Sequence, residues 1–299
     1  MEFKTLSLEK KGSIALLKFV RPEVMNAFNS QQVDEMKLAV TNLAGDKEIR
    51  VVILSGEGKA FTSGADLSEK EAKWENVHDA LIEGYLPSLK GIIEMPKLVI
   101  ASINGPAAGI GAAFAMACDF RVMSEDSYIL SVFSNIALVP DGGLNWLLAR
   151  NIGYTKALEY AVEAKKISAS ECLEFGIANK VCSLNDLDDV TFSWAKKLSE
   201  RSPQAVANTK KLMRESLEKK YLDTFEDEAK IQVEIFGNEE FKEGVSAFLL
   251  KENLIFRNKL INSNSYCFER GFGCIFIYTH TPFCIYSIAY FYISYCFRI

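Results

Sequence analysis

The stretch Lys97-Leu-Val-Ile-Ala-Ser-Ile-Asn-Gly-Pro-Ala-Ala-Gly-Ile-Gly111 joins a run of apolar residues to a turn that contains several glycines. The apolar run over residues 97–103 predicts a strand that is buried on both faces. Asn104-Gly-Pro106 ends this strand, and the small apolar residues from 109 to 118 predict a short helix. A junction of this kind points free backbone N–H groups, and the positive end of a helix dipole, at one place.

A second glycine-containing loop has the same setting. Ala60-Phe-Thr-Ser-Gly-Ala-Asp-Leu67 follows the β-branched run 49–56, which is typical of another buried strand. Two such loops from neighbouring strands can direct two amides at one carbonyl oxygen, which would form an oxyanion hole. The alternative is that the glycines only serve tight turns. A nucleotide fingerprint is disfavoured because Phe114 replaces its third glycine and no P-loop lysine follows.

The rest of the chain up to residue 258 predicts an α/β body with a helical C-terminal part. Asn29 is suited to cap the helix 30–44, with Gln32 at the third position. Ser168-Ala-Ser-Glu171 is a capping box, and Ser202-Pro203 predicts another helix start. The predicted elements are antiparallel strands over 3–9 and 13–20, a long helix over 68–95, a strand over 119–124 and helices through 186–258.

Composition excludes several kinds of chemistry. The 299-residue chain has a formal net charge of −5, which argues against sequence-independent nucleic-acid binding. It has two histidines, His78 and His280, so a multi-histidine metal site is excluded and no metal is predicted. His78 lies among acids, which is typical of a solvated helix face. The chemistry must therefore depend on carboxylates, backbone amides or a bound cofactor.

One aspartate stands out in the apolar segment 136–148. Asp141 lies between Pro140 and two glycines. It either caps the helix that follows, or it is a carboxylate in an apolar pocket, where burial raises the pKa toward the range useful for proton transfer. Arg21 also has two interpretations, as an ordinary surface charge or as a partner for a phosphate.

Six segments, taken together and in order, resemble the crotonase (enoyl-CoA hydratase/isomerase) superfamily over roughly residues 1–259. Each is weak alone, but their shared order is specific. They are Arg21-Pro-Glu-Val-Met-Asn-Ala-Phe28, Phe61-Thr-Ser-Gly-Ala-Asp-Leu67, Ala101-Ser-Ile-Asn-Gly-Pro-Ala-Ala-Gly-Ile-Gly111, Cys118-Asp119, Val139-Pro-Asp-Gly-Gly143 and Phe241-Lys-Glu-Gly-Val-Ser-Ala-Phe248.

The resemblance implies a ββα spiral core over 1–200 that binds an acyl-CoA thioester, and a helical region over 201–260 that covers the active site and serves oligomerisation. It implies that the protein forms a homotrimer or hexamer and takes part in fatty-acid metabolism. It also implies that no cofactor is needed beyond the coenzyme A of the substrate. The oxyanion amides map onto Ala65 and Ile110. Many members of the family have glycine at the position of Ile110. The implied substrate-binding residues are Arg21, Met25, Ser63, Gly64, Asp66, Leu67, Gly109 and Gly111.

The departures from the family pattern decide the expected reaction. The two glutamates of the family's hydratases map onto Ala113 and Phe133, so the two-carboxylate activation of water is expected to be lost. Pro140-Asp-Gly-Gly143 resembles the branch with Δ3,Δ2-enoyl-CoA isomerases and epoxyacyl-CoA isomerases, in which a single acid follows the proline. The expected function is a double-bond shift with Asp141 as the acid. A non-catalytic acyl-CoA-binding or scaffold protein, or a hydratase that uses another carboxylate, are the alternatives.

Residues 262–299 have a different composition. Twelve of the 34 aromatic residues and four of the seven cysteines lie there, and residues 271–297 contain no acid, lysine or arginine. The tail, from residue 261 onward, is interpreted as lying outside the fold and as arising from read-through or a mis-assigned exon. The alternative is a membrane anchor.

The expected location is inside the cell. The N-terminus lacks the pattern of a signal or transit peptide, and the three cysteines of the body are typical of buried thiols. Asn258-Lys-Leu260 resembles a degenerate peroxisomal signal, which is read only at a free C-terminus. A peroxisomal or a cytoplasmic location is therefore expected.

Overall fold

The computed structural model describes residues 3–70, 73–250 and Phe256. Residues 1–258 group into one compact unit and residues 259–299 into another, and the fold below is that of the first unit. The predicted tail and the tripeptide Asn258-Lys-Leu260 lie outside the described residues.

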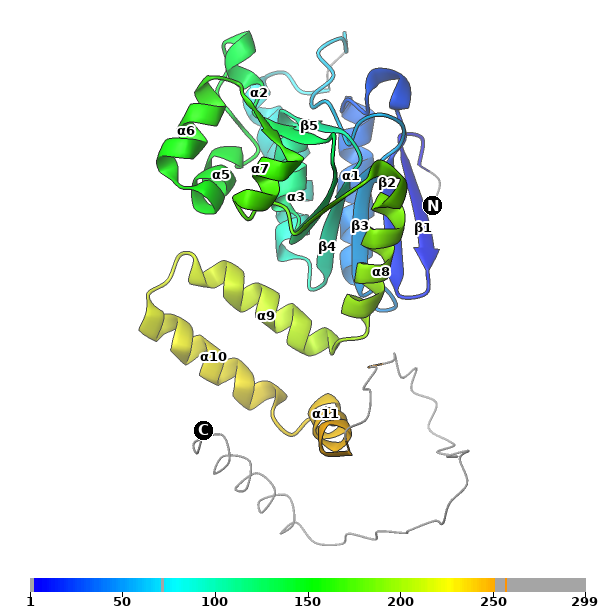
Figure 1. The fold of residues 1–299 in the computed structure, drawn as a ribbon, viewed down its shortest axis with the longest axis vertical. Coiled ribbons are helices and arrows are strands. Elements are labelled where there is room, and N and C mark those ends of the chain that lie inside the picture. The colour runs from blue at the N-terminus through cyan, green and yellow to red at the C-terminus, as the bar shows by residue number, and fades with distance from the viewer. Residues whose placement is uncertain (1–2, 71–72, 251–255, 257–299) are drawn as a thin grey trace, which may run out of the picture. The chain divides into compact units, whose positions relative to one another are not determined.

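The central element is a six-stranded sheet in the order β1-β2-β3-β4-β6-β9 (Figure 1). The predicted hairpin of β1 and β2 is antiparallel, and every later neighbour pairs in parallel. The strands are β1 (Leu6–Lys11), β2 (Ile14–Phe19), β3 (Val51–Gly56), β4 (Leu98–Ile103), β6 (Phe120–Ser124) and β9 (Lys180–Cys182).

Both faces of this sheet are covered, which explains why β3 and β4 are buried at every position. Ile53 and Ile100 are paired in register and lie in a cluster with residues of α8 (Leu187–Ser199). Leu54 and Ala101, one residue further along, point into the main core on the opposite face. Figure 1 shows α8 lying along one face of these strands. The unbroken apolar runs thus correctly predicted strands buried on both sides.

A smaller sheet of three strands, β5 (Pro106–Ala108), β7 (Tyr128–Leu130) and β8 (Lys166–Ser168), lies beside the large one. Single backbone bridges extend it: Thr62 pairs with Ala107, and Phe28 pairs with Ala65. The chain therefore leaves the large sheet after β3 and after β4 and passes through the small one at the two glycine loops. None of the three-residue strands was predicted, because each is too short to show a period.

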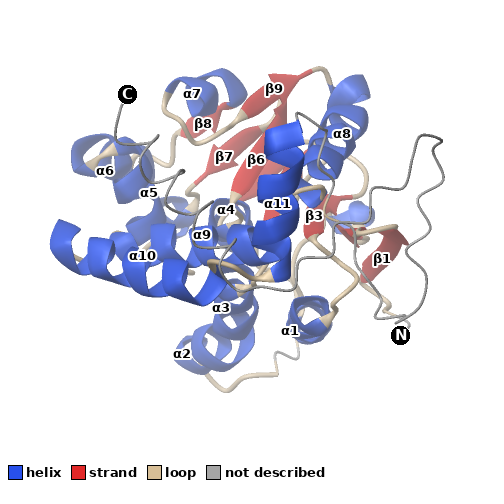
Figure 2. Ribbon diagram, turned by 90° about the horizontal axis from the view of Figure 1, so that it is seen from below, coloured by secondary structure: helices blue, strands red, loops and turns tan. Residues whose placement is uncertain are grey.

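Helices fill the space between the strands. α1 (Ser30–Gly45) begins as predicted, with the Asn29 side chain accepting a hydrogen bond from Gln32 N. The capping box of Ser168 and Glu171 at α7 (Ala169–Glu174) is also present, and Figure 2 shows α7 beside β8 and β9. Three further helices of the body are α4 (Ile110–Ala117), α5 (Leu144–Ile152) and α6 (Tyr154–Val162). Short 3-10 helices are η1 (Pro22–Val24), η3 (Phe133–Ile136) and η4 (Leu184–Asp186).

The predicted helix over 68–95 is wrong in its first part, because helical structure begins only at Val77. It is built from α2 (Val77–Asp79), the π-helix η2 (Ala80–Tyr85) and α3 (Leu86–Glu94). Residues before it are held in a loop, since Asp66 accepts hydrogen bonds from the backbone and hydroxyl of Ser68. Pro87 has no N–H to donate, and the preceding Leu86 N–H bonds to Leu81, five residues back.

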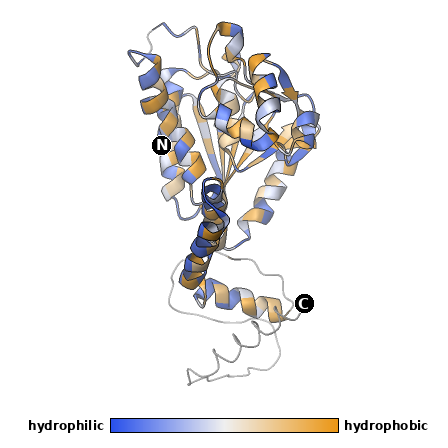
Figure 3. Cartoon of the chain, turned by 90° about the vertical axis from the view of Figure 1, so that its left-hand side faces the viewer, coloured by the Kyte–Doolittle hydropathy of each residue, from blue (hydrophilic) through white to orange (hydrophobic). Residues whose placement is uncertain are grey.

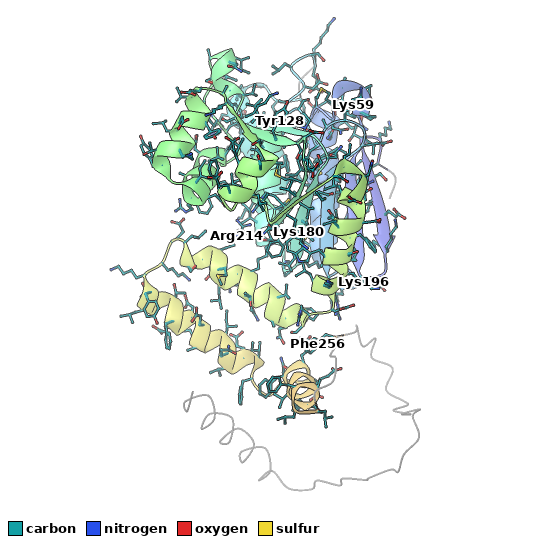
Figure 4. The ribbon with its side chains drawn as sticks, viewed as in Figure 1. Lys59, Tyr128, Lys180, Lys196, Arg214 and Phe256 are labelled. Carbon is teal, nitrogen blue, oxygen red and sulfur yellow. The ribbon has the colours of Figure 1, made fainter. Side chains whose placement is uncertain are left out.

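The C-terminal region is helical, as predicted: α9 (Pro203–Ser216), α10 (Tyr221–Ile235) and α11 (Glu239–Leu250) follow α8. Arg214, labelled in Figure 4, donates from α9 to Ala117 O and to Asp119. Lys210 makes a buried ion pair of 2.8 Å with the same aspartate. α10 has no buried residue, and Figure 3 shows hydrophobic residues spread along the C-terminal helices. Within the described part of the chain, no helix is long and apolar enough to cross a membrane.

Candidate active site

The two glycine loops lie against each other. Thr62 N donates to Pro106 O at 3.1 Å, and Ala108 N donates to Thr62 O at 3.0 Å. At the crossing point, a Cβ atom added to Gly64 would lie 2.9 Å from Ala108 O and 3.6 Å from the Cα of Gly109. Only glycine allows this approach, and the sequence prediction that the loops come together is confirmed.

The conformation of these glycines leaves two amides free. Gly64 has φ +103° and Gly109 has φ +57°, conformations that L side chains rarely adopt. Each precedes one of the predicted oxyanion residues, Ala65 and Ile110. Among the described residues, neither of these N–H groups has a hydrogen-bond acceptor. Ile110 is the first residue of α4, where unpaired N–H groups are expected. Gly64-Ala65 and Gly109-Ile110, called the amide corner below, therefore offer two amide donors from adjoining loops.

Asn26 fixes the position of this corner. Its side chain is fully buried, and Nδ2 donates to Glu57 O at 2.9 Å and to Ala60 O at 2.8 Å. Thr62 Oγ1 donates back to Asn26 O at 2.7 Å. Asn26 itself has φ +58°, which asparagine tolerates better than most residues. The sequence showed Asn26 only as part of a motif, and the structure gives it the role of joining three loop segments.

An ion pair closes the outer side of the corner. Arg21 Nη2 lies 3.0 Å from Asp66 Oδ2, and Nη1 of the same guanidinium donates to Ala27 O. The hydrogen bond from the Ser68 hydroxyl, followed by that from Arg21, lowers the pKa of Asp66. Arg21 is therefore engaged within the protein, next to the predicted oxyanion residue Ala65. Its predicted contact with coenzyme A stays a prediction.

The turn that contains Asp141 packs directly on the start of α4. Gly142 has φ +62°, and a Cβ atom there would meet Ile110 Cδ1 at 2.4 Å and Ala113 Cβ at 2.8 Å. The third neighbour is Leu89 Cδ1 of α3 at 3.4 Å. Asp141 is thus one residue away from a close contact with the residue that supplies the second amide.

The Asp141 carboxylate has no hydrogen-bond partner among the described residues, and its Oδ1 atom is buried. Burial alone raises the pKa of this carboxyl to about 6. The alternative of a helix cap is wrong. α5 begins at Leu144 after Gly143 without a side-chain cap, and only the backbone carbonyl of Asp141 accepts a bond, from Leu144 N.

This geometry agrees with comparisons to known proteins. Residues 9–259 match the family model described as enoyl-CoA hydratase/isomerase. The chain belongs to this family. It is 34% identical over 251 residues to a protein of Rhodobacter capsulatus named probable enoyl-CoA hydratase, covering 84% of this chain and 97% of that one. It is 30% identical to the 1,2-epoxyphenylacetyl-CoA isomerase of Escherichia coli, covering 87% and 100%. The crystal structure of an enoyl-CoA hydratase from Bacillus anthracis superposes with a TM-score of 0.81 at 26% identity, covering 85% and 99%.

The residues at the family's two glutamate positions are both apolar and close to the corner. Ala113 is fully buried in α4, and its Cβ faces Gly142. Phe133 is buried as well, and its Cζ would lie 3.9 Å from a Cβ on Gly109. Neither position therefore carries a carboxylate, and Asp141 lies in the turn that packs on Ala113.

The remaining predicted binding residues lie around the same loops. Met25 has φ 54° and accepts a hydrogen bond from Ser63 N at 3.0 Å. Gly111 is required for close packing, since a Cβ there would lie 2.5 Å from Thr62 Cγ2. Leu67 is largely exposed. His78 is also exposed, on the helix face predicted for it, beside Asp79. Among the described residues, no group of His, Cys, Asp or Glu is arranged to hold a metal ion.

Sequence reasoning missed Tyr85. Its side chain is buried, and its ring lies 5.9 Å from that of Phe28, whose backbone pairs with Ala65. Burial comes first among the causes that raise the pKa of Tyr85, and the charge of Asp141 second. Leu89, one helical turn after Tyr85, lies against Gly142, so the helix that carries Tyr85 reaches the turn of Asp141 although 56 positions of sequence separate the two residues. No local pattern marked it, because it lies in a segment that was predicted as ordinary helix.

Proposed function

We propose that this protein shifts a double bond in an enoyl-CoA thioester, from the 3- to the 2-position, with Asp141 as the only acid–base group. The observation that carries this proposal is the unpartnered, half-buried Asp141 carboxylate in the turn that packs on Ile110, with Ala113 and Phe133 at the two glutamate positions. The relative named 1,2-epoxyphenylacetyl-CoA isomerase is a second support for isomerisation.

The mechanism needs one carboxylate and two amides. Asp141 as carboxylate takes a proton from C2 of the substrate, and the C2–H electron pair becomes the enolate of the thioester. The double bond then moves as Asp141 returns the proton at C4. The amides of Ala65 and Ile110 donate to the enolate oxygen, and each such donor typically contributes about 3 kcal/mol to the transition state. No cofactor beyond the coenzyme A of the substrate enters this scheme.

The test compares the parent with Asp141→Asn. The parent is expected to convert a 3-enoyl-CoA to the 2-enoyl form, and the variant to lose roughly a thousandfold or more in kcat with its affinity for the thioester retained. Equal inactivity of both proteins, with the thioester still bound, would favour a non-catalytic acyl-CoA-binding protein and end the isomerase proposal.

The relative named as a probable enoyl-CoA hydratase makes water addition the second candidate. Water addition requires another carboxylate. Apart from Asp141, the acids whose negative charge raises the pKa of Tyr85 are Glu69 and Asp66. Both are engaged, Glu69 with Ser30 and Asp66 with Arg21. Water addition to a 2-enoyl-CoA by the parent would support the hydratase, and its absence would exclude it.

We also propose that the protein assembles into a homotrimer or hexamer. The helix α10 has no buried residue, yet Tyr221, Leu222, Phe225 and Val233 are apolar and exposed on it. An amphipathic helix is expected to cover such residues. Light scattering of the full chain would give three or six times the mass of one subunit, and Phe225→Asp should lower it. Leu38→Asp, a matched change at an exposed leucine of α1, should not.

A further inference from the structure

Tyr85 lies between the two halves of the site. Its ring packs on Phe28, which pairs with the oxyanion residue Ala65. Leu89, four residues further along the helix, faces Gly142 of the turn Pro140–Gly143, which contains Asp141 and is called the acid turn below. Residues four apart lie on one helix face, so Tyr85 and Leu89 together line the side that runs from the amide corner to Asp141.

The hydroxyl of Tyr85 has no hydrogen-bond partner among the described residues, and although the side chain is buried, its oxygen is not among the fully buried atoms, so it is open to a ligand. The two other acids whose charges reach it are already engaged. Glu69 accepts from the backbone and hydroxyl of Ser30, and Asp66 accepts from Arg21 and Ser68. Burial and these negative charges both raise the pKa of Tyr85, so the phenol keeps its proton and is a donor.

A second unpaired polar group lies on the adjoining helix. α1 packs against the π-helix that ends at Tyr85. On α1, Gln32 is completely buried, and neither its Nε2 nor its Oε1 has a partner within the described chain. A buried polar group left without a partner costs about 1–3 kcal/mol. Both polar atoms of Gln32 are closed off from any ligand, whereas the Tyr85 hydroxyl is open, so on these two helices Tyr85 is the group that a ligand with hydrogen-bonding atoms can meet.

We propose that the Tyr85 hydroxyl donates a hydrogen bond to an oxygen atom on the acyl group, and that the substrates are oxygenated acyl-CoA thioesters instead of plain alkyl ones. This rests on the acyl-CoA site of the proposed function but not on the double-bond shift. A plain alkyl chain would leave the phenol desolvated and unpaired, and sites built to hydrogen-bond a substrate reject analogues that lack the bonding atom.

The test measures binding, without turnover, by titration calorimetry of the full chain. The ligands are saturated and therefore cannot isomerise: hexanoyl-CoA and its 4-, 5- and 6-hydroxy derivatives. The parent is expected to bind at least one hydroxy derivative about tenfold more tightly than hexanoyl-CoA. Tyr85→Phe keeps the ring on Phe28 and should remove that preference, because the hydroxy derivative binds more weakly while hexanoyl-CoA, no longer covering an unpaired hydroxyl, binds at least as tightly as to the parent.

Tyr160→Phe is the matched control, because the Tyr160 side chain is also buried but its hydroxyl donates to Glu171 at 2.7 Å. It should keep the preference for the hydroxy ligand. The proposal is overturned if the parent shows no preference, if Tyr85→Phe keeps it, or if Tyr85→Phe weakens all four ligands alike. If none of the four binds, the acyl-CoA site fails as well. Isomerase inactivity with the binding pattern intact would remove only the proposed reaction.

Discussion

The amide corner and the acid turn, which face each other in the candidate site, are built in opposite ways. At the corner, the polar side chains around the two amides are paired: Asn26 donates to two loop carbonyls, the Thr62 hydroxyl donates to the Asn26 carbonyl, and Gly64 permits a close contact that no side chain would. At the turn, the Asp141 carboxylate has no described partner. Donors that stabilise a developing charge work best when they are fixed in advance, whereas an acid that exchanges protons must be free to do so.

Within the amide corner, the largest effect on activity is expected from Gly64→Ala. The new Cβ would lie 2.9 Å from Ala108 O, and φ +103° is strained for alanine. Displacement of the loop would move the Ala65 amide, so kcat for the proposed double-bond shift should fall by about 10²–10³. The free energy of unfolding should fall by about 1–3 kcal/mol. Enzyme kinetics and thermal unfolding measure the two effects.

Gly12→Ala is the control for backbone strain alone. Gly12 has φ +60° but nothing within 4 Å of its Cβ position. This variant should lose about 1 kcal/mol of stability and keep its activity. If both variants retain full kcat, the corner does not position a catalytic amide.

The second prediction concerns the protonation of the acid turn. Because burial raises the pKa of Asp141 to about 6, the carboxylate form needed as the base is lost as pH falls through that value. The plot of kcat/KM against pH should therefore rise with a limb near pH 6 and fall about tenfold for each unit below it. A profile that is flat between about pH 5 and 8 would contradict Asp141 as the base, since an ordinary aspartate titrates near 4.

The amino-acid pattern predicted the corner better than the turn and its surroundings. The strands before each loop are unbroken apolar runs, and the glycines at 64 and 109 have a backbone reason that the sequence can show. The contact of Gly142 with Ile110 and Leu89 joins three separate segments, so no local pattern reports it.

Tyr85 shows the same limit. Its position depends on the loop that replaces the expected helix before Val77 and on the π-helix Ala80–Tyr85. In that loop, Glu69 bonds to Ser30 at the start of α1, 39 residues away. A contact over that separation overrides local helix propensity, which is a weak determinant.

The third prediction separates two roles of Arg21. Arg21→Gln and Asp66→Asn should each lower kcat/KM by about 3- to 10-fold, because either change removes the ion pair beside the Ala65 amide. If Arg21 acts by holding Asp66, the double variant should be no worse than the single ones. If Arg21 instead binds a phosphate of coenzyme A, the two losses should multiply, mainly in KM.

The smallest expected effect is that of the unpaired Asp141 carboxylate on the free energy of unfolding. The folded-state pKa of Asp141, about 6, lies above the ordinary value of 3.8, so the folded protein binds this proton more tightly than the unfolded chain. Stability attributable to this site is therefore highest below pH 4 and declines as pH rises through 6. Asp141→Asn cannot ionise, so at pH 7.5 its free energy of unfolding should exceed that of the parent by about 1–2 kcal/mol, a Tm higher by a few degrees. At pH 4 the difference should vanish. A variant that is less stable than the parent at pH 7.5 would mean that the carboxylate has a stabilising partner, and the contrast between a held corner and an unheld acid would then be lost.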